Sequence, residues 1–207
     1  MSTITIVNNA DNYEVVRVAI YWRPVGATTL NTIAWRVVSP PPGGGQTVIA
    51  IPDNFGVYAN YPSQGDDPND PNAGNRTPIL SFNEYTARFV IGTSVSQDSQ
   101  VTTAAIAQVY TDLVLNEVRI DNDFSNGVWT HITKDGDDIY APQVVWPGAV
   151  RIVDIRPSLN LAIVSPSLSS AGRLADEVTT RVQTSIHEGE TATVLGSMWK
   201  GYSITVT

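Results

Sequence analysis

The stretch Tyr85-Thr86-Ala87-Arg88-Phe89-Val90-Ile91-Gly92-Thr93-Ser94-Val95 decides the fold class of this 207-residue chain. Every second position carries an apolar or β-branched side chain, which is the period of a strand with one buried face. A helix would instead place its apolar side chains three and four residues apart. We therefore expect a β-strand from Tyr85 to Val95.

Other short segments of the chain share this character. They are rich in β-branched and aromatic residues, and predicted strands cover residues 13–22, 33–38, 47–51 and 55–61. Turn residues separate them, most clearly the run from Pro40 to Gly45, which neither a helix nor a central strand accommodates. Strands separated by turn signals at intervals of about 8–12 residues are typical of a sandwich or a barrel. We expect an all-β, antiparallel β-sandwich.

Two segments compete for helix. Residues 101–115 hold three alanines and no helix breaker, and apolar residues recur every four positions from Leu174 to Ile186. The periodicity of apolar residues does not decide between helix and strand for either segment.

An internal repeat is the second organising feature of the sequence. Ile4-Thr5-Ile6-Val7-Asn8 resembles Val118-Arg119-Ile120-Asp121-Asn122, and Phe55–Ser63 resembles Leu159–Ser167. The repeat predicts two tandem sandwich-like lobes or one merged sandwich with pseudo-twofold symmetry. The alternative is chance self-similarity between segments rich in Val, Thr, Ser, Pro and Gly.

The boundaries follow from the repeat alignment. Residues 1–113 form the first predicted sandwich repeat and residues 114–207 the second. Thr93-Ser94-Val95 matches Thr184-Ser185-Ile186, so the acidic loop 64–78 is expected to be an insertion in the first repeat. The same match makes residues 178–186 a strand rather than a helix. The repeat also pairs residues 101–115 with residues 191–206, where Gly196 and Gly201 argue against a helix.

Composition excludes several function classes. With 12 basic and 20 acidic residues the net charge is −8, which disfavours nucleic acid and anionic membrane surfaces as partners. No apolar run approaches the roughly 20 residues that span a bilayer, so no transmembrane segment is expected. The chain has no cysteine, which excludes disulfides and thiolate chemistry. The first residues lack a Sec signal, so a cytoplasmic location is the default expectation, with non-Sec export as the alternative.

Catalytic signatures are scarce. His131 and His187 are the two histidines, and neither sits in a metalloenzyme motif or beside a nucleophile elbow. His131 is expected to be a strand-surface or hydrogen-bonded residue and His187 an exposed turn residue. The sequence therefore favours a non-enzymatic protein, and no cofactor is expected.

The densest acidic cluster is predicted where two loops fall at the same end of the sandwich. One loop supplies Asp135, Asp137 and Asp138, and the other supplies His187, Glu188 and Glu190. These six residues are the predicted ligand-binding site. Carboxylate oxygens suit calcium, so calcium is an open option, although neither loop follows the EF-hand pattern.

Aromatic residues suggest a ligand class. Trp22 and Trp146 each lie at the end of a predicted strand, where exposure would let them stack on a sugar ring. We expect a non-enzymatic binding module for carbohydrate or another surface ligand, using loops at one end. The alternatives are a structural, self-assembling or toxin-like protein, forming homo-oligomers through edge strands Thr3–Val7 and Ser203–Thr207, and a small histidine-dependent enzyme.

Overall fold

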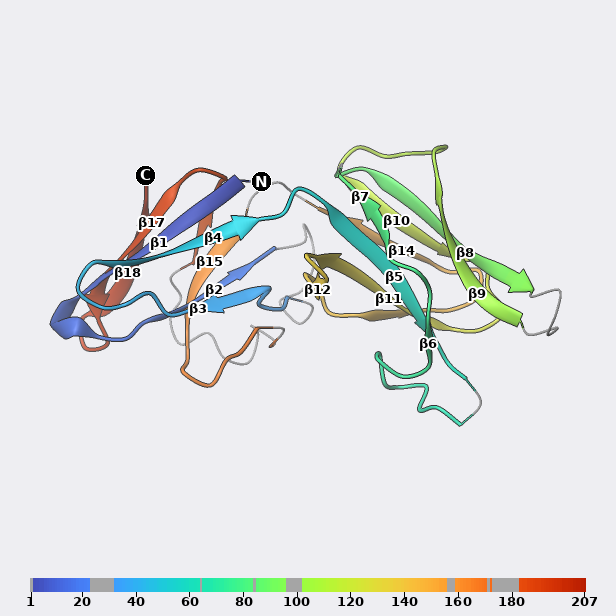
Figure 1. The fold of residues 1–207 in the computed structure, drawn as a ribbon, viewed down its shortest axis with the longest axis horizontal. Helices are drawn as coiled ribbons and strands as arrows, with labels where there is room; N and C mark the ends of the chain where they lie inside the picture. Colours follow the sequence, from blue (N-terminus) through green and yellow to red (C-terminus); the bar gives the residue numbers. More distant parts are fainter. Residues whose placement is uncertain are drawn as a thin grey trace. The chain divides into compact units, whose positions relative to one another are not determined.

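The computed structural model describes an all-β protein (Figure 1). The described residues are 2–22, 32–63, 65–83, 85–95, 102–155, 159–170, 172 and 183–207. Apart from the 3-10 turn η1 (Asp11–Tyr13), they form strands and loops. In this part of the chain no helix is long and apolar enough to cross a bilayer. The all-β prediction is confirmed.

Two compact units divide the chain. Unit 1 combines Met1–Asp53 with Arg156–Thr207, and unit 2 is the continuous segment Asn54–Ile155. These units differ from the predicted halves, because the boundary at residues 113 and 114 falls inside unit 2. The physical reason is that strands from the first quarter of the sequence pair with strands from the last quarter.

Unit 1 contains two sheets of four strands. The first has the order β18-β17-β1-β4 and the second β16-β15-β2-β3. The strands of the first sheet are β18 (Gly201–Val206), β17 (Thr191–Ser197), β1 (Ser2–Ala10) and β4 (Gly45–Ile51). Those of the second are β16 (Gln183–Ile186), β15 (Leu159–Val164), β2 (Arg17–Tyr21) and β3 (Arg36–Val38). The buried apolar side chains alternate along β1, where Ile4 and Ile6 are fully buried.

Unit 2 also contains two sheets. One has the order β14-β10-β8-β9, and the other β12-β11-β5-β6, with β13 also on β11 and β7 also on β5. The first is built from β14 (Val150–Asp154), β10 (Glu117–Asn122), β8 (Ala87–Val95) and β9 (Thr102–Val109). The second is built from β12 (Asp137–Asp138), β11 (Val128–Lys134), β5 (Phe55–Tyr61), β6 (Asn75–Arg76), β13 (Gln143–Val145) and β7 (Leu80–Phe82). Phe82 packs between Phe55 and Phe89, with ring centroids 5.4 Å away on each side.

One sheet in each unit has the same pattern of neighbours. β1 is antiparallel to β4 and parallel to β17, which is antiparallel to β18. Likewise β10 is antiparallel to β14 and parallel to β8, which is antiparallel to β9. The two parallel pairs depart from the antiparallel arrangement expected throughout. Parallel neighbours need a long crossover rather than a hairpin. The connection from β1 to β17 includes all the strands between them in the sequence, whereas the connection from β8 to β10 is β9, which pairs with the other side of β8.

The edge strands match the sequence prediction only in part. Thr3–Val7 lies in β1, which is paired on both sides, so its prediction as an edge is wrong. Residues 203–206 lie in the edge strand β18, so the prediction of Ser203–Thr207 as an edge is confirmed over these residues. Residues 102–109 form strand β9, so the strand prediction for 101–115 is confirmed over these residues and the helical alternative is wrong. Of the predicted strand at 178–186, residues 178–182 lie outside the described residues and Gln183–Ile186 is β16.

Two buried asparagines end the central strands β1 and β10. The Asn8 side-chain amide donates to the carbonyls of Glu14 (2.9 Å) and Pro40 (3.2 Å), and its Oδ1 accepts the Ala10 N–H. Asn122 has the same arrangement: its amide donates to Asn126 (2.9 Å) and Val145 (2.7 Å), and its Oδ1 accepts the Phe124 N–H. Both side chains are fully buried.

Two glycines complete this arrangement. Gly44 N–H donates to the Asn8 carbonyl and Gly148 N–H to the Asn122 carbonyl, at 2.8 and 2.7 Å. Both have positive φ, 87° and 73°, which glycine adopts without strain. Each asparagine therefore connects its strand to the loop that follows it in the sequence and to a second segment that is distant in the sequence.

Replacing either buried asparagine by alanine is expected to lower the free energy of unfolding by about 2–4 kcal/mol. At least two buried backbone groups lose their partners, and each such loss costs roughly 1–3 kcal/mol. Urea unfolding of Asn8→Ala and Asn122→Ala measures this. The control is Asn9→Ala, whose exposed side chain is expected to contribute less than about 0.5 kcal/mol. Stabilities within 0.5 kcal/mol of the unmodified chain for both buried variants would contradict the assignment.

Candidate functional site

The six predicted site residues fall in two different units. Asp135, Asp137 and Asp138 belong to the hairpin of β11 and β12 in unit 2. His187, Glu188 and Glu190 form the turn between β16 and β17 in unit 1, where Glu190 Oε2 accepts the His187 N–H at 2.7 Å. That the Asp135–Asp138 and His187–Glu190 loops bind one ligand together thus stays a prediction. Within the described ranges, no three His, Cys, Asp or Glu side chains lie close enough to hold a metal ion.

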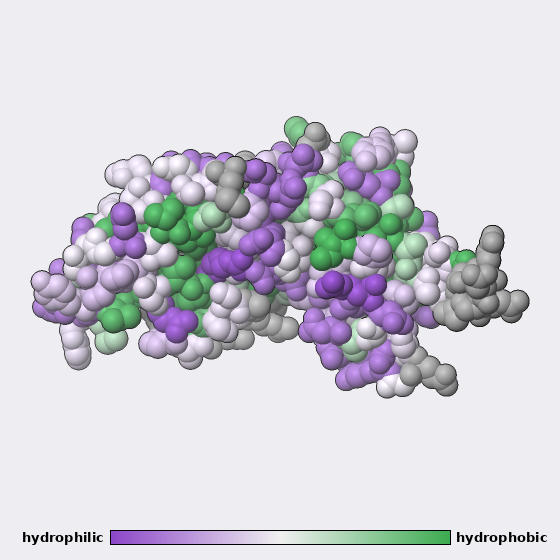
Figure 2. All heavy atoms as spheres, viewed as in Figure 1, coloured by the Kyte–Doolittle hydropathy of each residue, from purple (hydrophilic) through white to green (hydrophobic). Residues whose placement is uncertain are grey.

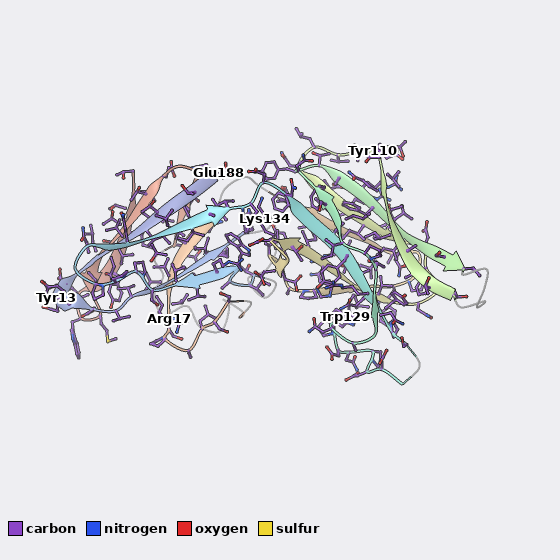
Figure 3. All side chains as sticks on the ribbon, in the orientation of Figure 1. Tyr13, Arg17, Tyr110, Trp129, Lys134 and Glu188 are labelled. Carbon is purple, nitrogen blue, oxygen red and sulfur yellow. The ribbon has the colours of Figure 1, made fainter. Side chains whose placement is uncertain are left out.

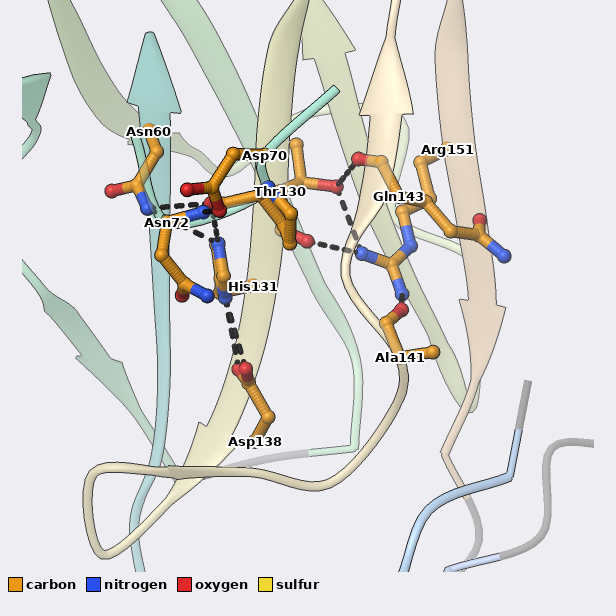
Figure 4. A network of polar contacts seen from close by, with 10 residues as sticks. Asn60, Asp70, Asn72, Thr130, His131, Asp138, Ala141, Gln143 and Arg151 are labelled. Carbon is orange, nitrogen blue, oxygen red and sulfur yellow. Dashed lines mark hydrogen bonds and ion pairs between the residues drawn. The ribbon is translucent and has the colours of Figure 1, made fainter. Parts of the chain in front are cut away.

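His131 lies at the centre of a buried polar network (Figure 4). Its side chain is fully buried, and its Nδ1 lies 3.0 and 3.1 Å from the two carboxylate oxygens of Asp138. Its Nε2 lies 3.1 Å from the Pro71 carbonyl oxygen. The ring stacks on Tyr58, with centroids 4.3 Å apart and planes 7° apart. His131 is thus hydrogen-bonded, one of its two expected environments.

His131 Nδ1 faces the Asp138 carboxylate, whereas Nε2 lies 3.1 Å from the Pro71 carbonyl oxygen and 3.5 Å from Asn60 Nδ2. A carbonyl oxygen cannot donate, and an ionised carboxylate only accepts. The Pro71 carbonyl also accepts from Asn60 Nδ2 at 2.7 Å. The contacts of His131 and Asn60 with Pro71 hold the loop after β5 against the sheet.

The neighbouring ionisable groups have perturbed pKa values. Burial raises the pKa of Tyr58, and the negative charge of Asp138 adds to this, while Arg76 opposes it. Burial lowers the pKa of Arg151 to about 10, so its guanidinium stays protonated at neutral pH. Arg151 donates to Thr130 O (2.6 Å), Thr130 Oγ1 (2.8 Å) and Ala141 O (3.2 Å). It links β14, β11 and the segment before β13, which is a structural role.

A pocket of about 190 Å³ lies beside this network, within unit 2. The loop after β5 forms one side and the ends of β11 and β13 form the other. Its lining residues are Pro62, Asp67, Pro68, Asp70, Ala73, Asn126, Gly127, Trp129, Val144 and Trp146. Figure 2 shows the atoms over the loop mostly in purple, as its Asp and Asn content requires.

Two tryptophans give the pocket its apolar surface. Trp146 is 62% exposed, and it lies against Gly127, where an added Cβ would come within 2.8 Å of the indole ring. Trp129, labelled in Figure 3 beside the loop, donates its Nε1–H to the Pro68 carbonyl at 3.0 Å. Trp129 is therefore held in a fixed orientation, while Trp146 offers its surface to solvent.

Two carboxylates supply hydrogen-bond acceptors. Asp67 Oδ1 accepts from the Asn69 backbone, and Asp70 Oδ1 accepts from the Asn72 backbone, both at 2.9 Å. These local turns orient each carboxylate. Among the described residues, Oδ2 of Asp67 and of Asp70 has no partner. The pocket thus combines an aromatic surface with fixed acceptors.

Sequence reasoning identified only part of this pocket. Exposure of Trp146 was expected and is confirmed, whereas Trp22 is buried against Trp35 with centroids 5.1 Å apart. Trp129 and Asp67 were not singled out. The pairing of β5 with β11 brings them together across about 60 residues of chain, and no local motif signals that.

Removing the His131 ring is expected to loosen the loop that it holds. Because a hydrogen bond contributes roughly 0.5–1.5 kcal/mol, amides of residues 65–74 in His131→Asn should exchange with deuterium roughly two- to tenfold faster. The control is His187→Asn, at the 65% exposed histidine. Exchange at β17 serves as an internal reference. Equal protection of the loop in both variants would show that His131 does not position it.

Comparisons with known proteins give no relative. No family model matches the chain, and neither a curated protein nor a solved structure matches it.

Proposed function

We propose that this protein is a non-enzymatic carbohydrate-binding protein, and that the Trp129–Trp146 pocket of unit 2 is its binding site. The observation that carries the proposal is the exposed indole of Trp146 beside two carboxylates with unused acceptor oxygens. A pyranose ring has an apolar face that packs on an aromatic ring and hydroxyls that donate to carboxylates. Pockets that combine apolar walls with a few polar groups are the common form of ligand site.

The charge of the pocket narrows the ligand class. Asp67 and Asp70 are acidic, and no basic side chain is among the lining residues. A uronate or another acidic sugar would bring a like charge next to these carboxylates, which lowers affinity. We therefore propose a neutral sugar as the ligand. The lining differs from the six residues expected from the sequence, which stay a separate prediction.

The rigidity of the pocket supports a binding role. The loop is fixed by the Trp129–Pro68, His131–Pro71 and Asn60–Pro71 hydrogen bonds. A site that is ordered before binding loses little conformational entropy when the ligand arrives.

A glycan array followed by calorimetry tests this function. We expect binding to neutral glycans and weaker or no binding to uronate-containing ones. Trp146→Ala should lower the affinity at least about tenfold, which corresponds to about 1.4 kcal/mol of binding free energy. Gly127→Ala should act in the same direction by displacing the indole.

The matched control is Trp199→Ala, because Trp199 is a still more exposed tryptophan of unit 1. Unchanged affinity in Trp146→Ala, or no neutral glycan bound by the intact protein, would refute the proposed site.

We further propose that residues 1–113 and 114–207 are copies of one repeat whose strands are divided between the units. β1 and β4 of the first copy would correspond to β10 and β14 of the second, and β8 and β9 to β17 and β18. The matching sheet patterns support this, as do the matching partners of Asn8 and Asn122. Each unit then combines the first half of one copy with the second half of the other.

The register of the strand pairs supports the same correspondence between the two copies and changes the alignment of their sequences. Phe55 pairs with Phe82, and Leu159 pairs with Ile186, so each partner lies 27 residues further along the chain. Ile186 therefore matches Phe82 rather than Val95, and loop 64–78 has a counterpart of equal length instead of being an insertion.

A circular permutant tests the duplication. Thr191 lies next to both Thr5 and Thr207, just as Arg88 lies next to both Arg119 and Val109. A copy of residues 110–116 joining residue 207 to residue 1, with new ends at 113 and 114, should therefore give a chain with an unchanged circular dichroism spectrum and a cooperative unfolding transition. A permutant with new ends inside β11 is the negative control. Failure of the first permutant to fold would contradict the correspondence.

A further inference from the structure

Four exposed apolar side chains lie together in unit 1, and we call them the apolar tip. Tyr13 ends the η1 turn, Val15 lies two residues after it, and Met198 and Trp199 come from the turn between β17 and β18. They are 77%, 70%, 73% and 89% exposed. Figure 3 labels Tyr13 at the end of its turn. Single exposed apolar residues are ordinary on protein surfaces, but a group of four with two aromatic rings indicates an interaction site.

Hydrogen bonds fix the two turns of the apolar tip to each other. Glu14 accepts the Met198 N–H at 2.9 Å and the Tyr202 hydroxyl. Lys200 forms an ion pair with Asp11 at 3.2 Å. Burial, together with the hydrogen bond to Glu14, raises the pKa of Tyr202 to about 12, so this hydroxyl stays a donor. Asp11, Glu14 and Lys200 therefore have partners within these two turns, while the four apolar side chains are exposed.

A shallow pocket continues the apolar surface inward. It has a volume of about 190 Å³, and its walls include Val15, Val164, Pro166 and Met198. Arg17 closes one side by donating to the carbonyls of Pro166 and Leu168, at 2.5 and 2.6 Å. The tip and the pocket form one apolar region within unit 1.

We propose that the apolar tip inserts into the interfacial layer of a zwitterionic phospholipid bilayer. Trp and Tyr favour this layer because their rings are apolar and their N–H and O–H groups are polar. A bilayer also receives projecting side chains without needing a complementary shape. The net charge of −8 opposes anionic lipids, so the partner is a neutral lipid surface.

A second protein molecule is a poorer fit for this surface. A stable interface covers about 800 Å² on each partner. Two aromatic side chains supply roughly 150–250 Å² each, and a valine and a methionine add less, so the tip falls short of that area. The proposal is independent of the carbohydrate site, because all its residues belong to unit 1.

Co-sedimentation with phosphatidylcholine vesicles tests the proposal. The intact protein should sediment with the vesicles, and 1 M salt should not release it, because the contact is apolar. Trp199→Ala should lower the partition coefficient about tenfold or more, and Tyr13→Ala should also lower it. Vesicles containing phosphatidylserine should bind the protein more weakly. Both residues are exposed, so these variants should unfold at the temperature of the intact protein.

The controls separate this proposal from the others. Trp146→Ala should bind vesicles normally while losing glycan binding. The proposal is overturned if the intact protein stays in solution at millimolar lipid, or if Trp199→Ala sediments as the intact protein does. It is also overturned if light scattering without lipid reveals a dimer that Trp199→Ala abolishes, because the tip would then be a contact between two copies.

Discussion

The buried side-chain amides of Asn8 and Asn122 are the interactions on which the rest of the structure depends. Each lies near the end of a central strand, where its side chain hydrogen-bonds two carbonyl groups and one N–H, and the contacts to the N–H and to one of the carbonyls are buried. One carbonyl is close in sequence, and the other is 32 residues away for Asn8 and 23 for Asn122. A leucine of similar volume would leave the buried carbonyl and the buried N–H without partners, so apolar packing cannot replace this arrangement. The hydrogen bonds of Asn8 and Asn122 fix the positions of the segments that they contact.

The parallel pairs β1–β17 and β8–β10 impose a second constraint. β1 pairs with a strand far away in the sequence, and β8 pairs with β10 on the side opposite β9, so neither unit is a simple succession of hairpins. Unit 1 needs both residues 2–53 and residues 159–207. Stability of this unit is therefore cooperative across the chain, because removing either segment removes half of each sheet.

The sequence predicted strands better than their arrangement, for a physical reason. Alternation from Tyr85 to Val95 reflects a local property, the two faces of a strand, and β8 occupies Ala87–Val95 as expected. Strand neighbours depend on long-range contacts that the alternation does not encode, so Thr3–Val7 was expected at an edge and lies in the middle of a sheet. Trp22 looked exposed because Pro24 follows it closely, yet its ring packs on Trp35. His131 shows the same limit, since its partners Asp138 and Pro71 come from opposite sides along the chain.

The order in which the units become complete during synthesis follows from the discontinuity of unit 1. Residues 54–155 contain every strand of unit 2, so this unit can close as soon as it leaves the ribosome. Strands β1 to β4 emerge earlier and wait for about 100 further residues before their partners appear. At roughly 5–20 residues per second, this delay is about 5–20 seconds. During that time the apolar faces of β1 and β2 are open to chaperones and to neighbouring nascent chains, so crowding on polysomes should reduce the yield of unit 1 more than that of unit 2.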